Sequence, residues 1–173
     1  RLRNRAIIYL SCCGLPGAGG AAKGVSVAMA LQGAAKICIA NRSVDKAQRL
    51  AAQIAALSDT QAEAVSLDAL QDAALYEQYS TIVNTTSLGM SPNVDAMIPI
   101  RVDALTSGHL VVDLIYNPLE TKLLRLAREQ GAQTASGLGM FLYQGVLAFE
   151  AWNGVRPDTS QMEQLLIERL SGR

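Results

Sequence analysis

Charged residues and histidine are scarce in this 173-residue chain, and each shortage excludes a class of protein. Charged residues make up 17% of it, and 15 Lys and Arg balance 15 Asp and Glu, so the formal net charge is zero. A neutral chain lacks the basic surface typical of proteins that bind nucleic acid or an acidic membrane, and we expect neither as a partner. A single histidine, His109, and the lack of a C-x-x-C motif argue against a metal site.

Long apolar runs and paired cysteines are also lacking. No run approaches the length of about 18 residues that a membrane-spanning helix needs. The first apolar stretch, Ala6–Leu10, is too short for the apolar part of a signal peptide and leads into glycines. Three cysteines, Cys12, Cys13 and Cys38, are an odd number and no disulfide framework. We therefore expect a protein of the reducing cytoplasm.

Apolar residues are plentiful, at half of the sequence, so the chain can bury a core and is not disordered. Its length predicts one domain, or one domain with a fragment of another. Several apolar runs have the length of a strand and are apolar on both faces, as buried parallel strands are. Strands are predicted at Ala6–Leu10, Lys36–Ala40, Tyr79–Asn84 and Leu110–Ile115, with weaker candidates at Val65–Leu67 and Thr134–Ser136.

Helical patterns lie between these runs. Gly33 and Gly131 are placed to end two of the helices, and Asn117-Pro118 is placed to open one. The helices are predicted at Ala21–Gln32, Val44–Leu57, Leu119–Gln130 and Phe141–Trp152, with a last one that Pro157-Asp158 and the capping box Ser160-x-x-Glu163 start and that ends near Leu170. The alternation predicts an α/β fold, a Rossmann-type parallel sheet with helices on both faces, and the last two helices form a C-terminal pair outside the alternation.

A glycine-rich segment, GAGGAAKG, precedes the first predicted helix. Its residues Gly17, Ala18, Gly19, Gly20 and Ala21 would let backbone N–H groups at a helix N-terminus approach a pyrophosphate. An ordinary tight turn is the alternative. The residues Ser11–Pro16 separate the segment from the first strand, so either the strand ends early before a longer loop or it continues through the cysteines.

The second strand is followed by Asn41, Arg42 and Ser43, two dozen residues after Gly17. A Rossmann fold meets the adenosine ribose at this point, and NAD sites usually offer a carboxylate there. A cationic Arg42, with Lys46 one turn further on, instead suits the 2′-phosphate of NADP. The alternative is a solvated arginine beside an N-cap at Ser43, and the two roles are compatible.

Six motifs together resemble the shikimate dehydrogenases in order and spacing, from about Gly17 to the C-terminus. They are Gly17–Gly24, Asn41–Ser43, Asn84–Met90, Asp113–Pro118, Gly137–Gln144 and Phe149–Asp158. The resemblance implies reversible hydride transfer between NADP(H) and carbon 3 of shikimate/3-dehydroshikimate, in aromatic amino-acid biosynthesis. Related quinate/shikimate dehydrogenases also accept quinate and can use NAD, usually with an acidic residue near the position of Arg42.

The same resemblance implies roles for individual residues. Thr85, Thr86, Leu114 and Gly137 match positions beside the cofactor, the last two flanking the nicotinamide. Tyr116 and Gln144 match the tyrosine and glutamine that contact substrate. From the residues alone, Tyr116 could equally be a turn aromatic and Gln144 a surface residue.

Neither of two further polar residues, Asp113 and His109, is expected to take part in catalysis. We expect Asp113 to cap a turn rather than to act as an acid, and we expect His109 to be exposed and without a catalytic role.

The family's substrate domain and its proton-handling Lys–Asp pair have no match here, so we assign no catalytic residue to this chain and expect it alone to be inactive. The resemblance divides the chain into a cofactor domain, 1–137, and helices 138–173 that complete the substrate domain in the family. Without that domain these helices would expose apolar faces, which predicts packing against it, against the chain's own sheet or against a second copy.

Three alternatives remain open. One is a non-catalytic NADP-binding module, and a second is another NADP oxidoreductase such as a glutamyl-tRNA reductase, which the motifs around Tyr116 and Gln144 disfavour. The third is a domain that binds no nucleotide, because Pro16 lacks a backbone N–H and restricts the residue before it, just ahead of the glycine-rich segment.

Overall fold

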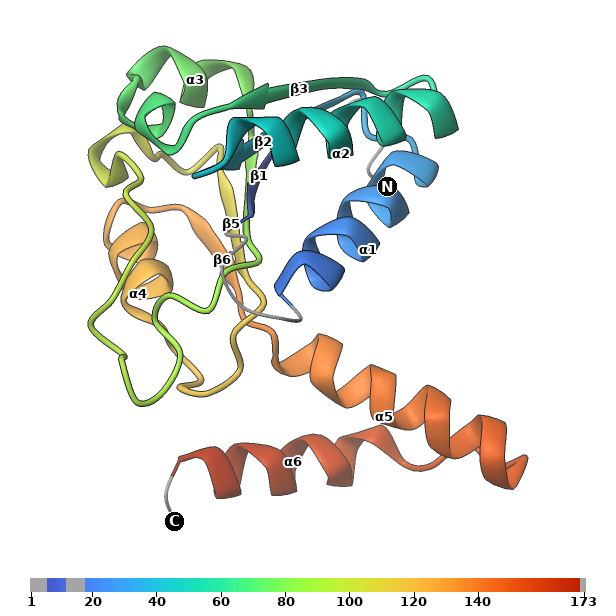
Figure 1. Cartoon of the computed structure of the whole chain (residues 1–173). Coiled ribbons are helices and arrows are strands. Elements are labelled where there is room, and N and C mark those ends of the chain that lie inside the picture. Colours follow the sequence, from blue (N-terminus) through green and yellow to red (C-terminus); the bar gives the residue numbers. More distant parts are fainter. Residues whose placement is uncertain (1–5, 12–17, 172–173) are drawn as a thin grey trace.

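A parallel sheet of six strands forms the centre of the protein (Figure 1). The computed structural model describes residues 6–11 and 18–171. Its strands are β1 (Ala6–Ser11), β2 (Lys36–Asn41), β3 (Gln61–Val65), β4 (Thr81–Asn84), β5 (Leu110–Asp113) and β6 (Gln133–Ala135). They lie in the order β3-β2-β1-β4-β5-β6, so the direction of winding reverses between β1 and β4. This order confirms the predicted Rossmann-type α/β fold.

Helices cover both faces of the sheet (Figure 1). The helical elements are α1 (Ala18–Leu31), α2 (Val44–Leu57), η1 (Leu67–Gln71), α3 (Ala73–Gln78), η2 (Val102–Ala104), α4 (Lys122–Glu129), α5 (Leu138–Asn153) and α6 (Thr159–Leu170). Helices α1 and α2 lie on one face, and α3 and α4 lie on the other.

Alternate residues of the central strands supply the two halves of the core. In β2, Ile37 and Ile39 pack in the cluster that includes residues of α1 and α2, whereas Cys38 packs in the cluster that includes α4. In β4, Val83 and Ile82 are divided between the same two clusters. All five are fully buried, which explains why these strands are apolar on both faces.

Most predicted elements are confirmed, with shifted ends. The range of α2 is as predicted, and Gly33 and Gly131 have the positive φ expected after a helix. The weak strand predicted at Val65–Leu67 was misplaced, because β3 ends at Val65 and a 3₁₀ helix begins at Leu67. The short elements η1, α3 and η2 were not predicted, since none is long enough to show a periodic pattern.

The start predicted for α4 at Asn117-Pro118 was wrong, whereas the start predicted for α6 at Pro157-Asp158 is confirmed and only the capping box at Ser160 was wrong. Helix α4 begins at Lys122, and its N-cap is Thr121, whose hydroxyl accepts a hydrogen bond from the Leu124 N–H at 3.4 Å. Asn117-Pro118 lies in the loop before it. Helix α6 is capped by Asp158, which accepts from the Ser160 N–H at 2.8 Å, so Ser160 is inside the helix and not its cap.

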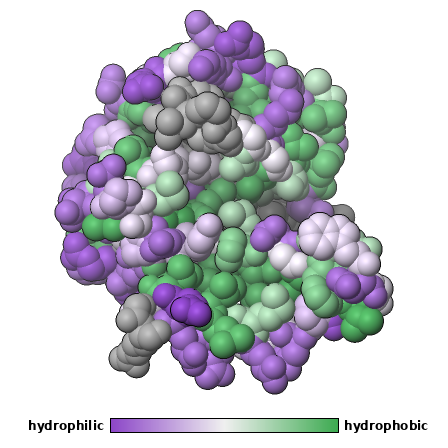
Figure 2. Space-filling model, turned by 60° about the horizontal axis from the view of Figure 1, so that its bottom comes forward, coloured by the Kyte–Doolittle hydropathy of each residue, from purple (hydrophilic) through white to green (hydrophobic). Residues whose placement is uncertain are grey.

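Helices α5 and α6 form a hairpin that extends away from the sheet (Figure 1). No residue of α6 is buried, and Trp152 at the far end of α5 is 82% exposed. Exposed apolar side chains on the two helices are Met140, Tyr143, Leu147, Phe149, Trp152, Leu165 and Ile167. Figure 2 shows hydrophobic surface gathered on this side of the molecule. Among the described residues, no helix is both long and apolar enough to cross a membrane.

Candidate functional site at the carboxyl edge of the sheet

The predicted site residues follow strands that end at one edge of the sheet. The register pairs Ser11 with Asn41, Leu10 with Asn84, and Asn84 with Asp113, so β1, β2, β4 and β5 end at nearly the same level. Helices α1 and α5 both begin on this side, the lower side in Figure 1. Open α/β sheets bind ligands at the carboxyl edge, beside the point where the winding reverses.

The start of α1 lies directly after the segment that leaves β1. Strand β1 ends at Ser11, and the predicted site residue Gly17 lies outside the described residues, as do Cys12, Cys13 and Pro16. The helix begins at Ala18, three residues earlier than predicted, which places Ala18, Gly19, Gly20 and Ala21 in its first turn. That turn holds no acidic residue, and the space beside Gly20 is open. First-turn N–H groups have no partner within the helix, so this end can accept the pyrophosphate of a dinucleotide.

The end of β2 presents two basic side chains to solvent. Asn41 is buried, and its Oδ1 accepts a hydrogen bond from the Ser43 N–H at 2.9 Å, which turns the chain into α2. Ser43 occupies the N-cap position, but its side chain makes no capping hydrogen bond. Arg42 and Lys46 are exposed, and neither forms an ion pair with any described residue. The arrangement fits the 2′-phosphate of NADP.

The turn after β4 is held by side chains. Asn84 Oδ1 accepts from the Thr86 N–H at 2.9 Å, and Thr86 Oγ1 accepts from the Leu88 N–H at 3.1 Å. Thr85 and Thr86 are both buried, so they form the floor of this turn rather than its exposed tip. Their backbone and hydroxyl groups lie at the same edge of the sheet as the start of α1.

Asp113 at the end of β5 is fully buried and accepts three hydrogen bonds. Its Oδ1 accepts from Asn84 Nδ2 at 3.0 Å and from the Ile115 N–H at 3.1 Å, and its Oδ2 accepts from Thr121 Oγ1 at 2.7 Å. Burial raises the pKa of Asp113, and the hydrogen bonds from Thr121, Ile115 and Asn84 partly oppose that rise. Its bond to Ile115 agrees with the turn-capping role predicted for it.

Gly137 packs against the loop that follows β5. Its N–H donates to the Ile115 carbonyl at 3.0 Å, and a Cβ on Gly137 would lie 2.0 Å from the Leu114 carbonyl oxygen. Only glycine permits this approach. The contact brings the predicted residues Leu114 and Gly137 together at the start of α5.

Tyr116 and Gln144 each contact Phe141, in the first half of α5. The Tyr116 ring stacks on the Phe141 ring, with 4.2 Å between centroids and 16° between planes. Gln144 is exposed, and its Nε2 donates to the Phe141 carbonyl at 3.0 Å. A phenol and an amide are groups that can hydrogen-bond the hydroxyls of a ligand.

Comparisons with known proteins place this chain in a family. The family model described as shikimate / quinate 5-dehydrogenase matches residues 12–114, more than half of the chain, and the shikimate 5'-dehydrogenase C-terminal domain matches residues 137–167. The chain belongs to the shikimate/quinate dehydrogenase family. The resemblance to shikimate dehydrogenases that the six motifs indicated is therefore confirmed.

Individual family members resemble the chain along most of its length. A shikimate dehydrogenase (NADP(+)) of Bacillus cereus strain G9842 is 45% identical over 160 residues, which are 91% of this chain and 55% of that protein. A crystal structure of a shikimate dehydrogenase in complex with NADP+ has a TM-score of 0.85 and 36% identity, covering 98% of this chain and 56% of that one. A shikimate 5-dehydrogenase from Listeria monocytogenes, in complex with shikimate and NAD, has a TM-score of 0.82 and 29% identity, covering 96% and 57%. The chain thus spans a little over half the length of these relatives.

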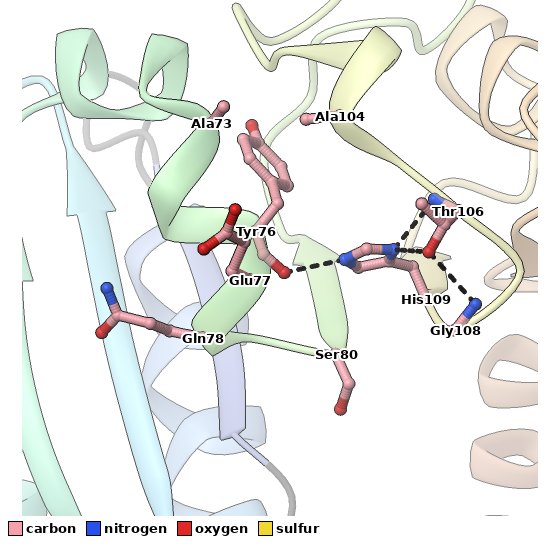
Figure 3. A pocket seen from close by; sticks show the side chains of 9 residues that line it. All are labelled: Ala73, Tyr76, Glu77, Gln78, Ser80, Ala104, Thr106, Gly108 and His109. Carbon is pink, nitrogen blue, oxygen red and sulfur yellow. Dashed lines mark hydrogen bonds between the residues drawn. The ribbon is translucent and has the colours of Figure 1, made fainter.

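His109 lies at the opposite, amino edge of the sheet, directly before β5, and the prediction that it is exposed was wrong. Its ring is buried beside an open hollow of about 620 Å³ (Figure 3). Nδ1 accepts from the Thr106 N–H at 2.9 Å, so Nε2 is the donor to the Tyr76 carbonyl, also at 2.9 Å. The imidazole therefore joins α3 to the loop before β5. Because the two joined residues are far apart in the sequence, no local sequence pattern predicts this contact.

Replacing His109 by alanine is expected to lower the free energy of unfolding by about 2 kcal/mol, because it leaves the Thr106 N–H and the Tyr76 carbonyl without their partner. Urea unfolding followed by circular dichroism measures the loss. Exposed Ser107 is the control, and Ser107→Ala should change stability by less than about 0.5 kcal/mol. A loss no larger for His109→Ala than for Ser107→Ala would show that the imidazole does not hold this contact.

The described residues contain no group of three or more His, Cys, Asp or Glu side chains that could hold a metal ion.

Asn84 and Asp113 were absent from the predicted site. Their positions could have been found from one signal, since each is an Asn or Asp that ends an apolar strand and precedes a predicted site residue.

Proposed function

We propose that this chain is the NADP-binding part of a shikimate dehydrogenase, which transfers hydride reversibly between NADP(H) and carbon 3 of shikimate/3-dehydroshikimate. The observation that carries the proposal is the exposed basic pair, Arg42 and Lys46, at the end of β2 in the sheet of a family member. NAD sites usually place a carboxylate at this strand end, and a cationic pair there favours a 2′-phosphate.

The cofactor residues are proposed to act in three groups. The first turn of α1, with Gly17 before it, binds the pyrophosphate through backbone N–H groups. Asn41, Arg42, Ser43 and Lys46 bind the adenosine ribose and its 2′-phosphate. Thr85, Thr86, Leu114 and Gly137 enclose the nicotinamide, the group that supplies hydride chemistry when the cofactor is bound.

Tyr116 and Gln144 are proposed to bind the substrate's hydroxyl groups and hold the ring in register with the nicotinamide. The chain has no match to the family's proton-handling Lys–Asp pair, so we propose that the proton donor belongs to the substrate domain. Residues 1–137 then form the cofactor domain, and helices 138–173 pack their apolar face on the substrate domain. A second copy of this chain is the alternative occupant of that face. The buried free thiol of Cys38 is compatible with the reducing cytoplasm that we propose for the protein.

Calorimetric titration with NADP⁺ and NAD⁺ tests the proposal. We expect a dissociation constant for NADP⁺ between about 1 μM and 1 mM, and binding of NAD⁺ at least about tenfold weaker. Lack of binding by either nucleotide would overturn the proposal and favour a domain that has lost its cofactor. Binding of both with equal affinity would point to the quinate/shikimate type.

Turnover separates the enzyme from its runner-up, a non-catalytic NADP-binding module. The runner-up would need no counterpart of the family's Lys–Asp pair, and residues 1–173 show no match to that pair. We expect no oxidation of shikimate by this chain alone, and oxidation once a substrate domain from a family member is added in trans. Quinate in place of shikimate decides which of the two substrates is preferred. If nucleotide binds but the mixture remains inactive, the non-catalytic module is the better description.

A further inference from the structure

Three strand ends, those of β2, β4 and β5, are closed in the same way. Each strand ends in an Asn or Asp whose side-chain oxygen accepts the backbone N–H of the residue two positions later. The pairs are Asn41 with Ser43 at 2.9 Å, Asn84 with Thr86 at 2.9 Å, and Asp113 with Ile115 at 3.1 Å. Such turns bend the chain sharply at a fixed point.

Asn84 and Asp113 are in addition bonded to each other. Asn84 Nδ2 donates to Asp113 Oδ1 at 3.0 Å, and the Asn84 carbonyl accepts from the Leu114 N–H at 3.0 Å. Asn84 therefore contacts its own turn through Oδ1 and the neighbouring turn through Nδ2 and its carbonyl. Both side chains are fully buried, so a bond lost here is not replaced by water at low cost.

The connection continues to the start of α5. The Ile115 N–H donates a hydrogen bond to Asp113, and the Ile115 carbonyl accepts one from the Gly137 N–H at 3.0 Å. Leu114 lies against Gly137, and Tyr116 stacks on Phe141 of the same helix. A shift of the turn at Asp113 would therefore also move the surface that carries Tyr116.

We infer that Asn84 and Asp113 are positioning residues that fix the turns 85–88 and 114–117 relative to each other. This inference rests on the proposed function, in which the two turns enclose the nicotinamide. Neither side chain is exposed, so neither touches the ligand, and their effect on binding is exerted through the turns they hold. The pair restricts the turns before the cofactor arrives, which lowers the ordering cost of binding.

Asn84→Ala tests the inference through NADP⁺ affinity. Its matched control is Thr60→Val at the amino edge, which deletes the buried hydrogen bond from Thr60 Oγ1 to the Ala34 carbonyl at 2.8 Å. We expect the dissociation constant for NADP⁺ to rise about tenfold or more in Asn84→Ala, since orientation errors at a binding site are costly. Thr60→Val should stay within about twofold of the unaltered chain, although it too is destabilised. Equal effects of the two variants would overturn the inference.

Conservative variants show whether the bond itself matters. Asp113→Asn keeps an oxygen that accepts from Asn84 and Ile115, so it should restore most of the affinity that Asp113→Ala loses. Asn84→Ser keeps a hydroxyl near the Thr86 N–H but cannot reach Asp113, and serves if Asn84→Ala does not fold. Affinity in Asn84→Ser equal to that of the unaltered chain would count against the link between the turns.

Hydrogen exchange separates failure of this inference from failure of the proposed function. Without nucleotide, the amides of Thr86 and Ile115 should exchange at least about tenfold faster in Asn84→Ala than in Thr60→Val, once global stability is matched. If the unaltered chain binds no NADP⁺, the proposed function fails and these exchange rates alone decide whether the pair fixes the turns. Unchanged exchange rates would refute it in either case.

Discussion

Gly137→Ala is expected to lower the free energy of unfolding by about 3 kcal/mol, because the new methyl group would overlap backbone that cannot rotate away. The Cβ would lie 2.0 Å from the Leu114 carbonyl oxygen and 2.4 Å from its carbon, well inside van der Waals contact. The loop 114–117 or the start of α5 must move to relieve this overlap. Because the Gly137 N–H is bonded to Ile115, either movement also breaks a hydrogen bond.

The same substitution is expected to weaken NADP⁺ binding at least about tenfold, since it displaces the loop proposed to lie beside the nicotinamide. Urea unfolding and calorimetric titration give the two quantities. Gly139→Ala, two residues further along the same helix, is the matched control, because nothing lies within 4 Å of the Cβ it would add. Alanine there should leave binding unchanged and stabilise α5 by up to about 1 kcal/mol. Equal stability of the two variants would show that the contact at Gly137 is not close in solution.

The sheet could be predicted from the sequence because burial leaves a local mark. The residues of β2 and β4 are apolar on both faces, and only strands covered on both sides need such a pattern. Helix ends were less predictable. Asn117-Pro118 has the composition of a helix start, yet the helix begins at Lys122 because the Thr121 hydroxyl bonds both to Asp113 and to the first turn of α4. That bond joins residues from two elements, and the local sequence does not encode it.

The residues of the candidate site likewise differ in how far the local sequence predicts them. Residues with an evident chemical purpose, such as Arg42 and Tyr116, were named from the sequence, and their binding roles remain predictions. Asp113 was predicted only as a turn cap and Asn84 was given no role of its own, because the hydrogen bond between their side chains joins two strands, 29 positions apart in the chain. His109 was misjudged for the same reason, since its partner Tyr76 lies 33 positions away.

Arg42→Ala is expected to weaken NADP⁺ binding by about 30-fold while leaving the affinity for NAD⁺ nearly unchanged, because a charged hydrogen bond contributes about 2 kcal/mol. The two nucleotides differ only in the 2′-phosphate, so the change in their ratio isolates the contact with that group. Arg42 is exposed and has no ion pair with any residue that the structure describes, so its removal should cost little stability. The loss should also shrink as salt is raised, since ions screen an exposed pair.

Two matched variants make the result specific. Arg42→Lys keeps the charge but loses the planar fork, so its affinity for NADP⁺ should fall between those of Arg42→Ala and the unaltered chain. Arg125→Ala removes another exposed arginine, one that pairs with Glu129 on α4 on the other face of the sheet, and should leave the binding of both nucleotides unaffected. If Arg42→Ala weakened NAD⁺ as much as NADP⁺, the arginine would contact a part common to both nucleotides. Lys46, one turn further along α2, would then be the remaining candidate for the 2′-phosphate, and Lys46→Ala would have to show the selective loss instead.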